Sequence, residues 1–172
     1  LLQAVSLRYF NPVGSHDSAL IGELPTTMPL NVMPIITQVA IGKRKKFVVF
    51  GNDYPTPDGS CIRDYIHVVD VAKAHVIAVM RLLNKKNLSA YEVFNLGTGK
   101  GFSVLELIHA FEKTIGQKLN FTIEGRRAGD VTAVYADTTL ANTVLGWNSE
   151  RNLNDMIRTA WNWELHLAGR TD

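Results

Sequence analysis

Runs of β-branched and aromatic residues alternate along this chain with longer runs in which apolar residues recur at helical spacing. Residues 4–10 have the composition of a buried strand, and residues 33–41 have the spacing of an amphipathic helix. The alternation continues to a last helix, which we expect to begin after an N-cap at Asn152. Strands that alternate with helices in this way predict an α/β fold.

The other expected elements continue the same order. Four further strands are predicted, at residues 47–50, 62–68, 91–96 and 119–124. Three further helices are predicted, at residues 70–83, 103–115 and 137–145. Asp70 and Asp137 are the expected N-caps of the first and third of these helices. Ser103 and Glu106 have the spacing of a capping box at the start of the second, and Gly116 is suited to end it.

Two long irregular segments separate these elements, at residues 15–30 and 51–60. Both are rich in proline and glycine, which disfavour regular structure. Ordered loops of this length are uncommon in a compact domain unless they have a function. Together with the unequal lengths of the strands and helices, they indicate a substrate-binding lobe more than a regular doubly wound sheet.

Composition excludes several classes of partner. Apolar residues make up 46% of the chain and charged residues 20%, which is typical of a globular protein. The net charge of +2 gives no reason to expect a nucleic-acid partner, and no apolar run is long enough to predict a membrane span. The five histidines lack the spacing of a metal site, so no metal is expected. A single cysteine, Cys61, excludes an internal disulfide and fits a reducing compartment such as the cytoplasm.

Two patterns have a functional and a structural interpretation. Residues 97–101, Gly-Thr-Gly-Lys-Gly, lie between a predicted strand and helix, as phosphate-binding loops do. Their spacing matches neither the dinucleotide fingerprint nor the P-loop, and we interpret them as a tight turn. The basic run at residues 43–46 follows a helix, where cations favour the negative end of the helix dipole. We interpret it as a solvated helix terminus and not as a nucleic-acid site.

Two other loops carry arginines after apolar strands. One contains Arg63, and the other contains Arg126, Arg127 and Asp130. A guanidinium group donates two parallel hydrogen bonds and suits a phosphate, and a carboxylate beside it can accept from sugar hydroxyls. The alternative is an Arg–Asp ion pair that only fixes the loop. The residues themselves leave both interpretations open.

Five segments resemble the UDP-glucose 4-epimerase family, at residues 7–14, 50–56, 63–68, 94–99 and 126–130. The resemblance runs in order over nearly the whole chain. It implies the C-terminal part of an extended short-chain dehydrogenase/reductase, with the end of a Rossmann-type sheet and a mixed α/β substrate-binding lobe in residues 1–172. The N-terminal NAD-binding domain would lie outside this chain. The start of the chain, inside a strand pattern and without an initiator Met, agrees with that interpretation.

The resemblance also implies a reaction. The family interconverts UDP-glucose and UDP-galactose in galactose metabolism, through a 4-keto intermediate and with NAD as the cofactor, and the full-length protein is expected to be a homodimer. Family members use a Tyr-x-x-x-Lys pair, but none of the five tyrosines here has a lysine four residues later. No catalytic residue is therefore expected in this chain, and we expect it to be inactive alone. A non-catalytic UDP-sugar-binding fragment and a nucleotide-sugar dehydratase or decarboxylase remain as alternatives.

Binding residues follow from the resemblance position by position. Phe10 would contact the nicotinamide end of NAD. The residues that would bind the UDP-hexose are Asn11, Asn31, Val32, Val48, Val49, Phe50, Arg63, Arg127, Asp130 and Val134. Within this set, residues 48–50 would hold the uracil, Arg63 and Arg127 the diphosphate, and Asp130 the ribose.

Two features depart from the family pattern or refine it. Leu24 and Leu30 stand where family members usually have an acid and a second asparagine. At the position of Val134, a bulky tyrosine disfavours N-acetylated sugars and a small residue admits them. The valine predicts that the full enzyme accepts UDP-N-acetylglucosamine as well as UDP-glucose.

Overall fold

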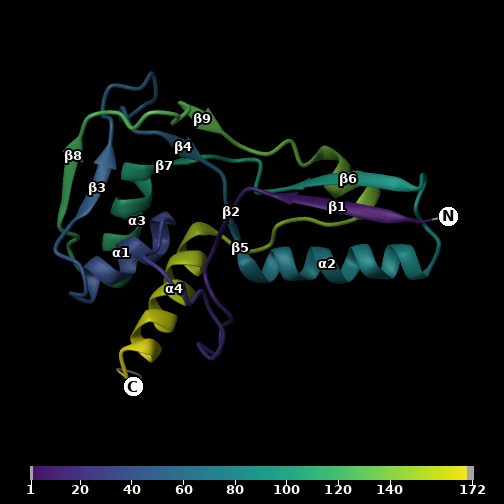
Figure 1. The fold of residues 1–172 in the computed structure, drawn as a ribbon, viewed down its shortest axis with the longest axis horizontal. Helices are drawn as coiled ribbons and strands as arrows, with labels where there is room; N and C mark the ends of the chain where they lie inside the picture. The colour runs from purple at the N-terminus through teal and green to yellow at the C-terminus, as the bar shows by residue number, and fades with distance from the viewer. Residues whose placement is uncertain (1, 170–172) are drawn as a thin grey trace.

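The computed structural model describes residues 2–169 as two packed lobes joined by short strands, an arrangement visible in Figure 1. Helices and strands alternate, and four of the five strand pairs are parallel, so the α/β class is confirmed. None of the helices within the described residues is long and apolar enough to cross a membrane.

The first lobe is built on two parallel strands, β1 (Ala4–Tyr9) and β6 (Tyr91–Leu96). Helix α2 (Val68–Leu83) covers one face of this pair in Figure 1, and a π-helix, η1 (Ala141–Leu145), packs beside β6. The apolar residues of these elements form one buried cluster, which includes Ile66, Val71, Ala74, Phe94, Leu96 and Trp147. Burial of this cluster fixes α2 against the strands.

The second lobe is built on another parallel pair, β3 (Phe47–Phe50) and β8 (Phe121–Glu124). Three helices pack with it: α1 (Val32–Ala40), α3 (Val104–Ile115) and α4 (Leu153–Leu167). Their apolar faces meet in a larger cluster, which includes Met33, Ile36, Val49, Leu107, Phe111 and Ile157. The apolar face of each helix is thus turned toward the core, as the helical spacing of the apolar residues predicts.

Five short strands lie between the lobes. β2 (Asn11–Val13) pairs in parallel with β5 (Tyr65–His67). β4 (Ile62–Arg63) pairs with β9 (Ala133–Val134) in parallel and with β7 (Phe102–Ser103) in antiparallel orientation. Most of these strands are too short to give a periodic signal in the sequence. They bring loops that are distant in the chain to one place between the lobes.

This region differs from the sequence expectations at two places. Residues 11–13 follow the strand expected at 4–10 and were not assigned to a strand, but they form β2, because their backbone pairs with β5. The single strand expected at 62–68 is two strands, since Asp64 separates β4 from β5. The Asp64 N–H donates to the Val134 carbonyl and its own carbonyl accepts from the Asn11 N–H, so the chain changes partner there from β9 to β2. The Asp64 carboxylate accepts hydrogen bonds from the loop after β6, including the Thr98 N–H.

The helix termini confirm most of the capping predictions. Ser103 and Glu106 form the expected capping box, and Gly116 ends α3 with φ of +74°. Asn152 caps α4, with Asp155 as its reciprocal partner.

Asp70 is not the N-cap of α2, and that prediction is wrong. His67 occupies the cap, and its Nδ1 accepts the Val69 N–H at 3.1 Å. Asp70 lies in the first turn, where Oδ2 accepts the backbone N–H groups of Glu150 and Arg151. Its carboxylate therefore ties α2 to the segment before α4.

The helix expected at 137–145 is shorter and partly a π-helix. Asp137 accepts the N–H of Thr139 at 3.0 Å, as a local cap does, but the helical residues begin at Thr139. The π-helix then ends at Gly146, whose φ of +73° suits glycine. Helical periodicity alone does not distinguish a π-turn from an α-helix.

We predict that Ile157→Ala lowers the free energy of unfolding by about 2–5 kcal/mol, because it leaves a cavity in the core of the second lobe. Ile157 is completely buried, whereas Ile123 in β8 is 44% exposed. The matched change Ile123→Ala should cost less than about 1 kcal/mol. Denaturant unfolding of both variants measures the difference, and equal losses would contradict the assignment of the core.

Candidate functional site: a cavity between β3, α1 and the arginine loops

A cavity of about 310 Å³ opens where the second lobe meets the short strands. Its volume lies within the range of small-molecule sites. Polar and apolar residues both line it, and they are Asn11, Leu30, Asn31, Val32, Ile35, Phe47, Val48, Phe50, Cys61, Arg63, Tyr65, Val104, Arg127 and Asp130. The wall therefore combines an apolar surface with two guanidinium groups and a carboxylate.

The strand order explains why these residues meet. β3 and β8 run in parallel, and Phe50 at the end of β3 is the register partner of Glu124 at the end of β8. Arg127 follows three residues later, so it emerges at the same edge as Phe50. Ligands of α/β sheets bind at the carboxyl ends of parallel strands. The cavity lies at such an edge.

Helix α1 supplies another part of the wall. Asn31 is its N-cap residue, and Val32 and Ile35 lie one turn apart on the side of the cavity. The Asn31 side chain makes no capping bond and instead donates to Glu23 Oε1 at 2.8 Å. This bond links the cavity wall to the long loop that precedes α1.

Asp130 lies between the two arginines of the cavity. Arg127 donates to it through Nε at 3.2 Å and Nη2 at 2.9 Å, and Arg63 Nη2 lies 3.5 Å from Oδ1. Hydrogen bonds from Arg127 to Asp130 raise the pKa of the Arg127 guanidinium above its ordinary value. Two guanidinium groups against one carboxylate leave one net positive charge, which favours an anion.

The neighbouring arginine has a different environment. Arg126 donates to Asp53 through Nε at 2.7 Å and stacks over the Tyr54 ring at 4.1 Å. Arg127 faces the cavity, with its guanidinium 5.5 Å from the centre of the Phe50 ring. Arg126 therefore fixes the loop, whereas Arg127 lines the cavity, where a ligand could contact it. Both sequence interpretations, ion pair and anion site, are present in the geometry.

The glycine-rich turn after β6 is a structural element. The backbone N–H groups of Thr98 and Gly99 donate to the carboxylate of Asp64, at distances of 2.9–3.1 Å. A Cβ on Gly97 would lie 2.4 Å from Asp64 Oδ2, so the close approach requires glycine there. The protein's own carboxylate occupies the position that a phosphate takes in a phosphate-binding loop. The interpretation of this segment as a tight turn is confirmed.

The basic run after α1 is engaged within the protein. Lys43 Nζ lies 2.6 Å from Glu164, Arg44 bonds to Gln38, and Lys46 lies 3.5 Å from Glu124. Among the described residues, no group of three or more histidine, cysteine or acidic side chains has the arrangement of a metal site.

The family model described as GDP-mannose 4,6 dehydratase matches residues 1–160. The chain belongs to this family. The resemblance to UDP-glucose 4-epimerases, which are extended short-chain dehydrogenase/reductases, is confirmed as well. UDP-glucose 4-epimerase of Drosophila melanogaster is 51% identical over 160 residues, which are 93% of this chain and 45% of the relative.

Two solved structures have the same fold as this family member. The UDP-glucose 4-epimerase of Stenotrophomonas maltophila, with bound NAD and formylated UDP-arabinopyranose, is 50% identical with a TM-score of 0.93. The enzyme of Bifidobacterium longum, in complex with NAD⁺ and UDP, is 45% identical with a TM-score of 0.90. The matches cover 99% and 98% of this chain, and 50% and 49% of those chains. The chain thus spans about half the length of these relatives.

Eight of the ten residues expected from the family to bind UDP-hexose line the cavity: Asn11, Asn31, Val32, Val48, Phe50, Arg63, Arg127 and Asp130. Val49 is outside the lining, because alternation along β3 turns its side chain into the core, where it is 1% exposed. Val134 is also outside it, but it is the register partner of Arg63 and is 37% exposed. It therefore lies beside the cavity.

Phe10 is separate from this group. It lies between β1 and β2, and its N–H donates to the Leu96 carbonyl at 3.2 Å. It is outside the lining of the cavity, so its expected contact with a nicotinamide remains a prediction.

Several lining residues were missed by sequence reasoning, and two of them had a signal. Cys61 and Tyr65 lie two residues before and after Arg63, and alternation in an extended chain places all three on one side. Tyr65 is 1% exposed, and burial raises the pKa of its hydroxyl group. The others, Leu30, Ile35, Phe47 and Val104, come from four separate segments that only the tertiary fold brings together.

Proposed function

We propose that this chain is the UDP-hexose-binding, C-terminal part of a UDP-glucose 4-epimerase, and that the cavity takes the uridine diphosphate group. The observation that carries the proposal is the pair of arginines on one carboxylate, beside an aromatic ring, at the carboxyl edge of parallel strands. The similarity to epimerase structures with UDP or a UDP-sugar supports it.

Each part of the ligand has a chemically suitable partner in the cavity. The uracil ring would lie against Val48 and Phe50, where apolar and aromatic surface is available. The diphosphate would take hydrogen bonds from Arg63 and Arg127, which already face one acceptor. Asp130 would accept from the ribose hydroxyls as the arginines turn from it to the phosphates.

The hexose would extend from the diphosphate past Asn11 and Asn31, whose amides suit hydroxyl and phosphate oxygens. A ligand held firmly at its nucleotide end leaves the sugar free to present either face. In a 4-epimerase, this positioning is the part of the reaction that these residues would supply.

Residues 2–169 contain no turn that fits the pyrophosphate of a dinucleotide. In the glycine-rich turn between β6 and α3, the Thr98 and Gly99 N–H groups donate to Asp64, so neither is available to a pyrophosphate. We infer that NAD, which the epimerase relatives hold, binds mainly to a second part of the enzyme that precedes this chain. Phe10 is the residue that we expect to reach it. A homodimer in the cytoplasm is the expected state of that full-length protein.

We predict that Arg127→Gln weakens UDP binding by about 10- to 100-fold, because two charge-assisted hydrogen bonds are lost. Arg126→Gln is the matched control and should change the dissociation constant less than about threefold, since Arg126 pairs with Asp53 outside the cavity. Isothermal titration calorimetry with UDP and with uridine measures both effects. Uridine, which lacks phosphates, should bind both variants alike, and equal losses of UDP affinity would refute the site.

The chain with added NAD should not convert UDP-glucose to UDP-galactose, because it has no Tyr-x-x-x-Lys pair. The measurement is product separation after long incubation, with a full-length epimerase as the positive control. Turnover that follows this chain through purification and is lost in Arg127→Gln would contradict the prediction.

We predict that Val134→Tyr reduces affinity for UDP-N-acetylglucosamine about tenfold and leaves UDP-glucose affinity almost unchanged. The reason is that a larger side chain beside Arg63 would occupy the space of the acetamido group. Val79→Tyr on α2, which is 55% exposed in the first lobe, is the control. Competition calorimetry with the two sugars tests it, and unchanged N-acetyl affinity in Val134→Tyr would exclude this role.

A nucleotide-sugar dehydratase is the second candidate, because the matching family model is described as a GDP-mannose 4,6 dehydratase. Family membership therefore does not decide between epimerisation and dehydration. Mass spectrometry of the product of the complete enzyme separates them, since dehydration removes one water and epimerisation leaves the mass unchanged.

A further inference from the structure

A buried histidine joins three segments behind the cavity. His67 is 0% exposed, and both of its ring nitrogens have partners. Nδ1 accepts the N–H of Val69 at 3.1 Å, and Nε2 lies 3.0 Å from Thr159 Oγ1 on α4. Because Nδ1 accepts a backbone N–H, the ring proton must lie on Nε2 and be donated to Thr159. The geometry therefore defines a neutral imidazole in one tautomer.

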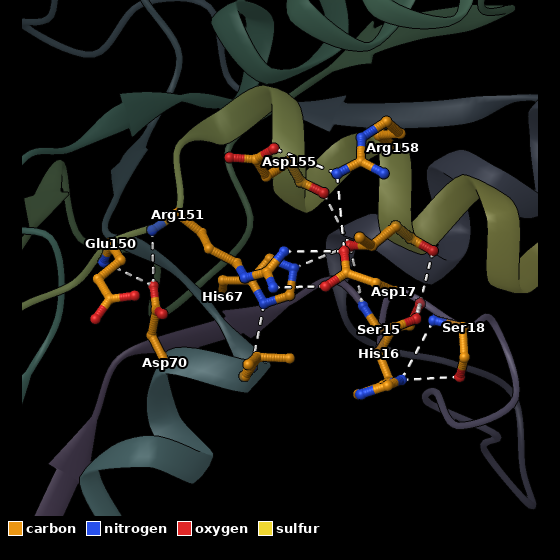
Figure 2. Close-up of polar contacts among 12 residues, drawn as sticks. Ser15, His16, Asp17, Ser18, His67, Asp70, Glu150, Arg151, Asp155 and Arg158 are labelled. Atoms are coloured by element: carbon orange, nitrogen blue, oxygen red, sulfur yellow. Dashed lines mark hydrogen bonds and ion pairs between the residues drawn. The ribbon is translucent and has the colours of Figure 1, made fainter.

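Thr159 connects this histidine to the long loop. Its hydroxyl group donates to the Asp155 carbonyl at 2.8 Å and accepts the Ser15 N–H at 3.2 Å. The Ser15 hydroxyl in turn donates to the Thr159 carbonyl at 2.7 Å. With the bond from His67, the single donor and both acceptor positions of the Thr159 hydroxyl are used. Figure 2 shows Ser15 and His67 on the same side of α4.

The backbone before Ser15 depends on the same contact. Gly14 has φ of +90°, and a Cβ there would lie 2.8 Å from both His67 Nε2 and Thr159 Oγ1. Only glycine permits the chain to approach the His67–Thr159 pair so closely. The start of the loop is thus fitted to this pair by shape as well as by hydrogen bonds.

The loop leads directly to the cavity. Residues 15–31 run from Ser15 to Asn31, and both Leu30 and Asn31 line the cavity. At its middle, the Glu23 carbonyl accepts the Trp163 indole N–H of α4 at 2.8 Å, and the Glu23 carboxylate accepts from Asn31. α4 therefore contacts the loop through Thr159, through Trp163 and through the Arg158–Asp17 ion pair, and the contact at Thr159 is the one that involves His67.

Charged groups surround the histidine. They come from the loop, α2, the segment before α4 and α4 itself, and they are Asp17, Asp70, Arg151, Asp155 and Arg158. Arg151 donates to both Asp17 oxygens, at 2.9 and 2.5 Å, as Figure 2 shows. Burial, and then Arg151, lower the pKa of His67 below its ordinary value, although Asp70, Asp17 and Asp155 oppose this.

We propose that His67 is a positioning residue for the UDP cavity, which it affects through Thr159 and the Ser15–Asn31 loop, and that protonation of His67 releases this loop. A proton on Nδ1 would turn an acceptor into a donor that faces the Val69 N–H, so the cap on α2 is lost. The ring would have to move away from this N–H, and its movement would take the Nε2–H out of line with the Thr159 hydroxyl group that holds Ser15. The inference rests on the proposed function, because it assigns a proton-dependent control to the same UDP-sugar site.

The lowered pKa of His67 determines how the stability of the native arrangement changes with pH. Between this pKa and the ordinary histidine value of about 6.5, an unfolded or released His67 binds a proton and the native one does not. The native arrangement is therefore fully favoured above about pH 6.5 and is progressively disfavoured as the pH falls below it.

The experiment measures UDP-glucose affinity at pH 7.5 and pH 5.5 by calorimetry on the whole chain. Both phosphates of this ligand are esterified, so its charge is constant over the range. We expect wild-type affinity to fall about tenfold on acidification, and Thr159→Val to bind about fivefold to tenfold more weakly at pH 7.5. Thr159→Ser keeps the hydroxyl group and should restore binding. Thr143→Val, which removes an exposed hydroxyl on η1, is the matched control and should not change it.

His67→Gln separates this histidine from the other titrating groups. Gln cannot gain a proton, so the fall in affinity between pH 7.5 and pH 5.5 should be largely absent. Wild-type affinity that is equal at both pH values, or Thr159→Val binding as tightly as wild type, would overturn the proposal.

Amide hydrogen exchange without ligand gives a second readout. Protection of residues 15–31, corrected for intrinsic exchange rates, should fall about tenfold at pH 5.5 in wild type and be low at both pH values in Thr159→Val. Loop protection that does not respond to pH or to this substitution contradicts the inference. Absence of UDP-glucose binding by wild type at pH 7.5 contradicts the proposed function instead, and the exchange data distinguish the two failures.

Discussion

The buried carboxylate of Asp64 determines how the two lobes meet. It accepts hydrogen bonds from the N–H groups of Thr98, Gly99 and Ala136 and from the Thr98 hydroxyl, all within 3.1 Å. These donors follow β6 and β9, while Asp64 itself lies between β4 and β5. Hydrogen bonds to a buried charge contribute more than neutral ones, and several converge here. The residues on either side, Arg63 and Tyr65, point to the opposite side and line the cavity.

The hydrogen bonds to Asp64, which lie outside the cavity, therefore fix the positions of cavity residues. Arg63 is held at the junction by Asp64, and its Nη1 also donates to the Val131 carbonyl at 2.8 Å, next to Asp130. Asp130 then faces Arg63 and Arg127 together. In this arrangement the carboxylate keeps two cations close together without a ligand, which limits the cost of their mutual repulsion. In the proposed function, a diphosphate would replace the Asp130 carboxylate as the acceptor for guanidinium groups that the fold already holds close together.

The longer elements were predicted because they depend on local signals: helical periodicity and capping residues such as Ser103 and Asn152 defined α3 and α4. Residue types alone pointed to the arginine loops and left an ion pair and an anion site open. The other predicted residues of the cavity came from the resemblance to UDP-glucose 4-epimerases. The short strands β2, β7 and β9 were not predicted, since two or three residues carry no period and form only through their partners. Asp70 was misassigned for the same reason, because its partners lie 80 residues further along the chain. The proposed role of His67 had no signal in the sequence, because Ser15 and Thr159 come close to it only in the folded chain.

The position of the diphosphate is the central claim, and a crystal structure of this chain with UDP tests it most directly. The account predicts the uracil ring against Val48 and Phe50, with the phosphates between Arg63 and Arg127 and the ribose beside Asp130. Phosphates bound instead at the Gly97–Gly101 turn, with Asp64 displaced from Thr98 and Gly99, would contradict it.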